Sequence, residues 1–123
     1  FPLADTDLAQ AIDIACAHPL ARDGGKPQVI EKVCAALGID PQRAMLVGDG
    51  ASDLEAAPAI GLFVGFGGVV TRPRVLEQAQ LFLPGPELAP VALIAAGPSQ
   101  AARLEELDPQ LVAIARHQLS LVP

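Results

Sequence analysis

The chain has 123 residues, of which 51% are hydrophobic and 18% are charged. This composition fits one packed domain with a single core and excludes intrinsic disorder. The net charge of −6, without a basic cluster, argues against nucleic acid or an anionic membrane as a partner. No apolar run approaches the length of about 18 residues that a membrane-spanning helix needs.

The N-terminus and the cysteines point to a cytoplasmic protein. The chain begins at Phe1 and has neither a basic start nor a long apolar core, so a secretory signal is not visible. A start without Met indicates a processed product or a piece of a longer protein. The two cysteines, Cys16 and Cys34, lie in apolar helix-like segments and are interpreted as small buried hydrophobes in a reducing compartment.

Helical and strand patterns alternate along the chain. Short apolar runs bounded by glycine or proline predict strands, and apolar residues at helical spacing predict helices. In chain order the predicted elements are helices at 5–17 and 27–37, a strand at 44–47, a helix at 52–57, a strand at 62–64, a helix at 73–79, a strand at 81–83 and a helix at 86–95. The helix that ends before Gly38 is expected to turn four apolar residues inward: Val29, Ile30, Val33 and Leu37.

This alternation predicts the fold class. Strands that alternate with helices at this spacing are typical of parallel βαβ units, so we expect an α/β protein with a parallel sheet flanked by helices. After Gly97 the strand signal disappears. Residues 99–119 are typical of a helical hairpin whose second arm is capped by Asp108 before Pro109. The sequence therefore predicts a C-terminal helical extension.

Two aspartates flank a glycine turn directly after the first predicted strand. The segment Gly48–Asp53 reads Gly-Asp-Gly-Ala-Ser-Asp and leads into a helix. In open parallel sheets, ligands bind beyond the carboxyl ends of the strands. Mg²⁺ takes oxygen ligands, usually one or two carboxylates together with phosphate and water, so Asp49 is a candidate ligand. The alternative is a plain glycine turn in which Asp53 caps the helix.

Two further glycine-rich stretches fall beside predicted helices or strands. Gly24-Gly25-Lys26 places a lysine at a helix start, where it can hold a phosphate or balance carboxylates; the alternative is a solvated charge. Residues 65–72 follow a strand, allow close backbone approach and end at Arg72, which can reach an anion. This stretch lacks the spacing of a dinucleotide-binding motif, and its alternative is a glycine loop without a ligand.

Together these stretches resemble the C-terminal half of a phosphoserine phosphatase, within the haloacid dehalogenase-like (HAD) superfamily of aspartyl-phosphate phosphatases. The resemblance covers residues 24 to about 94. It is carried by Gly-Gly-Lys at 24–26, by Val-Gly-Asp-Gly-Ala-Ser-Asp-Leu-Glu-Ala-Ala at 47–57, and by Phe-Val-Gly-Phe-Gly-Gly at 63–68 with Arg72 and Val75. Together with the chain length and the helical patterns at both ends, it predicts one domain at 1–123, made of an N-terminal helical segment at 1–22, half of a Rossmann-like HAD core at 24–96 and the helical extension at 97–123.

The resemblance also implies a role for each matching residue. Lys26 would contact the transferred phosphate and the nucleophilic carboxylate, and Asp49 would bind Mg²⁺. Asp53 would be the second acidic residue of the metal motif and would orient metal-bound water or the lysine. The substrate side would include three more residues: Gly50, Ser52 and Arg72.

The family mechanism also needs an aspartate nucleophile and a second aspartate two residues later, in an Asp-x-Asp-x-Thr motif on an apolar strand. The only Asp-x-Asp here is Asp5-Thr6-Asp7, which follows a short run broken by Pro2 and has Ala9 in place of the threonine. We interpret Asp5 and Asp7 as helix-cap or solvated acids. The chain is therefore predicted to lack the nucleophile half of the site and to be inactive alone.

The predicted function of the parent protein is a Mg²⁺-dependent phosphomonoester hydrolase of the phosphoserine phosphatase type, acting through an aspartyl-phosphate intermediate. The expected partner is a small phosphorylated metabolite similar to phosphoserine. Two alternatives stay open. The chain is a noncatalytic binding or assembly module with 97–123 as a partner surface, or it is a half-enzyme completed by another chain or within a homo-oligomer.

Overall fold

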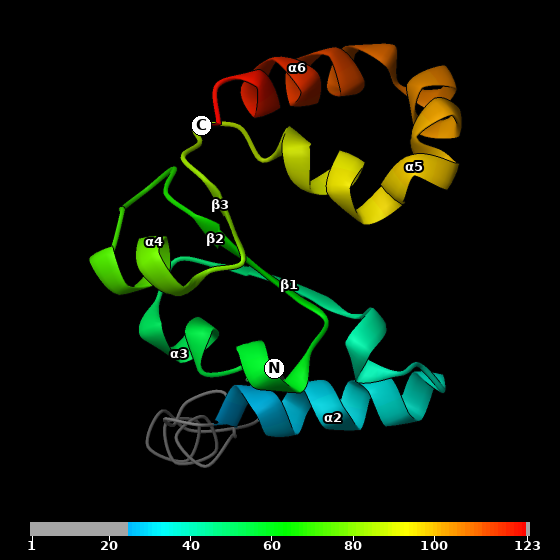
Figure 1. Ribbon diagram of the computed structural model, residues 1–123. Helices are drawn as coiled ribbons and strands as arrows, with labels where there is room; N and C mark the ends of the chain where they lie inside the picture. Colours follow the sequence, from blue (N-terminus) through cyan, green and yellow to red (C-terminus); the bar gives the residue numbers. More distant parts are fainter. Residues whose placement is uncertain (1–24, 123) are drawn as a thin grey trace, which may run out of the picture.

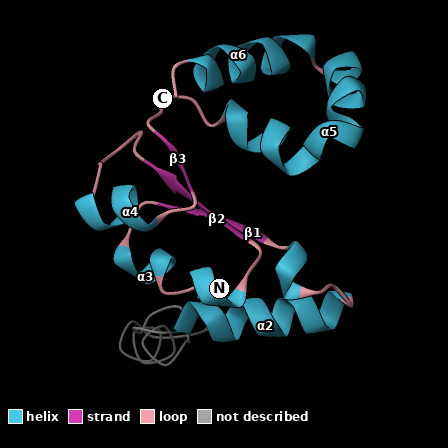
Figure 2. Cartoon of the chain, in the orientation of Figure 1, coloured by secondary structure: helices cyan, strands magenta, loops and turns pink. Residues whose placement is uncertain are grey.

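A computed structural model describes residues 25–122, which form a three-stranded parallel sheet with helices on both sides (Figures 1 and 2). The helices are α2 (Gly25–Leu37), α3 (Ala51–Leu54), α4 (Pro73–Gln78), α5 (Ala89–Leu107) and α6 (Pro109–Ser120). The strands are β1 (Met45–Gly48), β2 (Leu62–Phe66) and β3 (Leu81–Leu83). The predicted α/β fold class is confirmed.

The sheet has the strand order β1-β2-β3, and both neighbouring pairs are parallel. Gly48 pairs with Gly65, and Phe66 pairs with Leu83, so the three strands end along one edge. The strands carry apolar side chains on both faces, as expected of a sheet that has helices on both sides. The residues that follow the strands therefore gather at the edge where parallel α/β sheets bind ligands.

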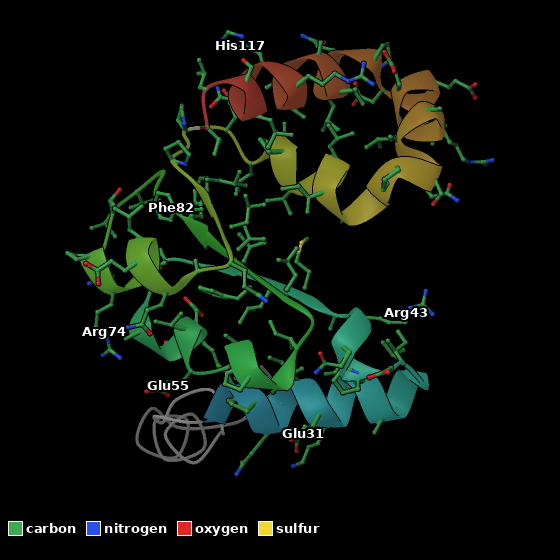
Figure 3. The ribbon with its side chains drawn as sticks, viewed as in Figure 1. Glu31, Arg43, Glu55, Arg74, Phe82 and His117 are labelled. Atoms are coloured by element: carbon green, nitrogen blue, oxygen red, sulfur yellow. The ribbon has the colours of Figure 1, made fainter. Side chains whose placement is uncertain are left out.

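The main core lies between the sheet and helices α2, α3 and α4, below the strands in Figure 1. Phe63 on β2 has no exposed surface and is the largest of the fully buried residues. Phe82 on β3, labelled in Figure 3, packs against the same cluster. The buried cluster consists of four residues: Leu54, Ile60, Phe63 and Val75.

Helix α2 begins earlier, and α3 ends earlier, than the sequence pattern predicts. Because α2 starts at Gly25, Pro27 is its third residue rather than its first. The first four N–H groups of an α-helix have no partner within the helix, so a proline at this position removes no hydrogen bond. Helix α3 is a single turn, because Pro58 has no N–H that could continue the helical hydrogen-bond pattern to the carbonyl of Leu54, and a 3-10 turn follows at Ala57–Ala59.

The inward face of α2 also differs from the prediction. Ile30 packs against the core and the free thiol of Cys34 is buried, as expected for a small hydrophobe. The expectation for two other residues is wrong, since Val33 is 50% exposed and Leu37 is 65% exposed. The stripe that faces the sheet runs through positions 30 and 34, and Val33 lies about 100° around the helix from Cys34.

Helices α5 and α6 lie on the opposite side of the sheet from α2, α3 and α4 (Figure 1). Helix α5 is kinked at Gly97, whose φ of 68° interrupts the helix before Pro98. The carboxylate of Asp108 accepts a hydrogen bond from the backbone N–H of Leu111 at 3.0 Å, so the predicted cap of α6 is confirmed. None of the described helices is long and apolar enough to cross a membrane.

Part of the predicted organisation lies outside the described residues. This applies to the predicted helix at 5–17 and to Asp5, Asp7, Cys16 and Gly24. The division into a segment at 1–22, a core at 24–96 and an extension at 97–123 therefore stays a prediction.

Candidate active site

The segment Gly48–Asp53 turns the chain from β1 into α3 at the carboxyl edge of the sheet. Strand β1 ends at Gly48 and α3 begins at Ala51, so Asp49 is the first residue beyond the strand. Gly50 has an extended backbone at the N-terminal cap of α3. The turn therefore presents a carboxylate at the edge where ligands of parallel sheets bind.

Asp53 is the buried acidic residue of this turn, with 9% of its surface exposed. Its Oδ1 accepts a hydrogen bond from the ammonium Nζ of Lys26. Its Oδ2 accepts one from the backbone N–H of Gly50 at 3.1 Å. Burying a carboxylate is costly unless it is paired and hydrogen-bonded, and Asp53 meets both conditions. Asp53 thus joins the first turn of α2 to the turn that follows β1.

The side chain of Asp53 folds back over the backbone of Gly48. A Cβ at position 48 would overlap the carboxyl group of Asp53. Glycine at this position permits the close approach, and the approach brings the carboxylate within reach of Lys26. Gly48 is therefore required by the packing of the site.

The ammonium group of Lys26 neutralises one of the two carboxylates of the turn. The lysine side chain is 30% exposed, so it is reachable from solvent. An ammonium has three N–H donors, and the contact with Asp53 uses one of them. The remaining donors are suited to an anionic ligand at the same edge of the sheet.

A cavity of about 600 Å³ opens beside Asp49, between the sheet and the first half of α5. Asp49 is half-buried, and among the described residues that line the cavity it alone carries a charge. The remaining walls are apolar: Val47, Gly48, Phe66, Leu88, Val91, Ala92 and Ala95. The sequence pattern does not identify Phe66 or the residues of α5 as walls of this cavity. The apolar stretch at 88–96 predicts a helix but not which part of the sheet that helix packs against.

The glycine loop after β2, residues 67–72, leaves the sheet at the same edge. The N–H of Gly67 donates a hydrogen bond to the carbonyl of Leu83 at 2.8 Å, which extends the pairing of β2 and β3 beyond the end of β2. The loop ends at Arg72, which is exposed at the start of α4. The three motif stretches thus reach one side of the sheet, with Lys26 in contact with the turn after β1.

The predicted site residues fall into two groups. Asp53 contacts both Lys26 and Gly50, and Asp49 directly precedes Gly50 in the chain. Ser52 is exposed in α3 and Arg72 is exposed before α4. Within residues 25–122, no hydrogen bond or ion pair joins Ser52 or Arg72 to the first group.

The carboxylates of the turn fit part of a Mg²⁺ site. Residues 25–122 contain no group of three or more His, Cys, Asp and Glu side chains that would hold a metal ion. Mg²⁺ usually takes one or two protein carboxylates and completes its shell with phosphate and water. Asp49 can supply one such carboxylate, while the carboxylate of Asp53 accepts hydrogen bonds from Lys26 and Gly50.

Comparison with known proteins agrees with two of the three motif stretches, those at 24–26 and 47–57. A haloacid dehalogenase-like hydrolase model matches residues 2–61. The chain is 42% identical to the phosphoserine phosphatase of Drosophila melanogaster and 37% identical to that of Homo sapiens, each over 66 residues or 54% of this chain. It is 39% identical to a phosphoserine phosphatase of Polaromonas sp. over 56 residues, or 46% of this chain.

The matched segments cover 24%, 28% and 22% of those three relatives, so this chain spans about a quarter of their length. The family-model match at 2–61 includes β1 and the acidic turn that follows it. Residues 2–61 of the chain therefore match a haloacid dehalogenase-like hydrolase model, and the chain is similar to phosphoserine phosphatases over about half of its own length.

Proposed function

We propose that this chain supplies the lysine and metal-binding half of the active site of a Mg²⁺-dependent phosphomonoester hydrolase, with phosphoserine as the expected substrate. The observation that carries the proposal is the contact between Lys26 and the buried Asp53, next to Asp49 at the carboxyl end of β1. A simple helix cap needs only the contact between Asp53 and Gly50. It does not need a lysine 27 residues away or a glycine under the carboxylate.

Lys26 is the proposed phosphate contact. Asp53 holds the ammonium group at the carboxyl edge of the sheet, and its own hydrogen bond with Gly50 keeps the carboxylate in place. A fixed ammonium offsets the negative charge of a phosphate and of the transition state without reorganising during the reaction. Asp53 is therefore a positioning residue that acts through Lys26.

Asp49 is the proposed protein ligand of Mg²⁺ from this half of the site. A bound Mg²⁺ would neutralise phosphate charge and stabilise the charge that develops during phosphoryl transfer. Asp49 is half-buried and lies beside an apolar cavity, so it is partly removed from bulk solvent. Electrostatic attraction is stronger at such a site than in bulk solvent.

The covalent step of the proposed mechanism needs a carboxylate nucleophile. The phosphoryl group would pass from the substrate oxygen to a carboxylate oxygen, the alcohol would leave with a proton from a neighbouring acid, and water would then release phosphate. Residues 25–122 contain no Asp-x-Asp motif. We therefore expect the nucleophile from another part of the parent protein or from a complementing chain.

Titration of the 123-residue chain with Mg²⁺, followed by isothermal calorimetry, tests the proposal. We expect weak saturable binding by the unaltered chain and loss of that binding in Asp49→Asn, because the amide lacks the charge that a hard cation prefers. Glu77→Gln, which removes the same charge from an exposed site on α4, should bind as the unaltered chain does.

Two outcomes would count against the proposed site. Equal Mg²⁺ affinity in Asp49→Asn and the unaltered chain would show that Asp49 is not the ligand. No measurable binding by any of the three proteins would favour the noncatalytic module.

The purified chain should release little or no phosphate from phosphoserine in the presence of Mg²⁺. The physical reason is that Lys26 and Asp49 stabilise charge but do not form the covalent intermediate. Colorimetric phosphate detection measures the rate, with a whole phosphoserine phosphatase assayed in parallel as the positive control. An enzyme-like rate from a chain of verified mass would contradict the proposed division of the active site.

A further inference from the structure

The turn after β3 presses against the glycine loop after β2. Gly85 has a φ of 82°, a backbone conformation that favours glycine. A Cβ at position 85 would lie 2.5 Å from the Cα of Gly68 and 3.0 Å from its N, so the two backbones touch without room for a side chain. A side chain at position 85 would therefore displace one of the two loops.

The contact continues to the aromatic ring of Phe66. A Cβ on Gly68 would come within 2.6 Å of Cε1 of Phe66, and a Cβ on Gly85 would lie 3.5 Å from Cε2 of the same ring. Phe66 is also part of the wall of the cavity that contains Asp49. A continuous line of contacts thus joins the turn after β3 to the candidate active site: Gly85 packs on Gly68, and Gly68 packs on the ring of Phe66.

We infer that Gly85 is a positioning residue for this site: by packing on Gly68, it fixes the ring of Phe66 as the cavity wall beside Asp49. The inference rests on the proposed function, because the place of the wall matters only if Asp49 binds a ligand. The hydrogen bond from Gly67 to Leu83 joins the start of the glycine loop to the end of β3. Because this bond holds the two strands together, a displacement of Gly85 is expected to move Gly68 rather than to separate β2 from β3.

Gly85→Ala tests the inference, with Gly97→Ala as a matched control. Gly97 has a comparable φ of 68°, but a Cβ there would meet nothing within 4 Å. Both replacements force a side chain into the left-handed region, so both should lower thermal stability. Displacement of Gly68 is expected from Gly85→Ala alone.

Two measurements separate the variants. The first is the ring-current shift that Phe66 imposes on the NMR signals of Gly68, in a chain that has four phenylalanines and no Trp or Tyr. The second is the Kd for Mg²⁺ by calorimetry. Gly85→Ala should change the Gly68 shift and weaken Mg²⁺ binding about tenfold. Loss of a residue that orients a metal site typically lowers metal affinity by about 10- to 100-fold, and the expected effect lies at the lower end of that range. Gly97→Ala should leave both quantities unchanged.

The inference is overturned if Gly85→Ala matches Gly97→Ala in both measurements. If the unaltered chain binds no Mg²⁺, the proposed function fails, while the Gly68 shift still decides whether Gly85 positions the ring. Should Gly85→Ala not fold, Phe66→Leu removes the ring and leaves both glycines in place. It must then weaken Mg²⁺ binding by a similar factor, and an unchanged Kd would overturn the inference.

Discussion

Phe63→Ala should lower the free energy of unfolding by about 4 kcal/mol, the usual cost of truncating a fully buried phenylalanine. Phe63 has no exposed surface and packs with Leu54, Ile60 and Val75, which come from different segments. The sheet and helices hold these neighbours in place, so the cavity cannot collapse fully. Because domains are stable by only about 5–15 kcal/mol, such a loss is a large share of the total.

Urea unfolding followed by far-ultraviolet circular dichroism is the suitable measurement, because the chain has no Trp or Tyr for fluorescence. Val69→Ala is the control: Val69 is 88% exposed on the glycine loop, so its truncation should change stability little. The expected change there is below about 0.5 kcal/mol. If the two variants were equally stable, Phe63 would not be at the centre of the core.

The strands are predictable from the sequence because each is a short apolar run with turn residues at its ends. The predicted strand at 81–83 coincides with β3, and those at 44–47 and 62–64 differ from β1 and β2 by one or two residues. Parallel pairing follows, because each pair of strands is separated by a segment long enough for a helical crossover. The common carboxyl edge, and hence the neighbourhood of the acidic turn and the glycine loop, follows from the pairing.

The faces of the helices are less predictable. Helix α2 carries two overlapping apolar stripes, one through Val29, Val33 and Leu37 and one through positions 30 and 34. Local spacing does not say which stripe faces the sheet, because the position of the sheet decides it. The cavity wall from α5 is hidden from the sequence for the same reason, since it depends on how α5 packs above β1 and β2.

The central contact of the site joins residues 27 positions apart, and no local pattern encodes it. The residues alone left two interpretations of Asp53, a helix cap and a functional acid. Asp53 accepts hydrogen bonds from both Gly50 and Lys26, so capping and ion pairing are not exclusive. The substrate-side roles of Ser52 and Arg72 stay predictions, because both side chains are exposed in the described part of the chain.

Lys26→Met should lower the free energy of unfolding by about 2 kcal/mol, because it leaves a buried carboxylate without its cation. Methionine keeps an unbranched apolar stem, so the loss reports the charge rather than the packing. The side chains of Lys26 and Asp53 are 30% and 13% exposed, so water offsets part of the loss. Lys32→Met, at an exposed position of the same helix, is the control and should change stability by less than about 0.5 kcal/mol.

A double-mutant cycle isolates the ion pair from the other roles of the two residues. Asp53→Asn keeps an oxygen that accepts from Gly50 and removes the charge that Lys26 neutralises. Lys26→Met should therefore cost less in the Asp53→Asn background than in the unaltered chain, with a coupling of about 1 kcal/mol or more by urea unfolding. Equal costs in the two backgrounds would mean that Lys26 and Asp53 are uncoupled in solution. The proposed function would then lose the contact that supports it, and the acidic turn would reduce to a helix cap.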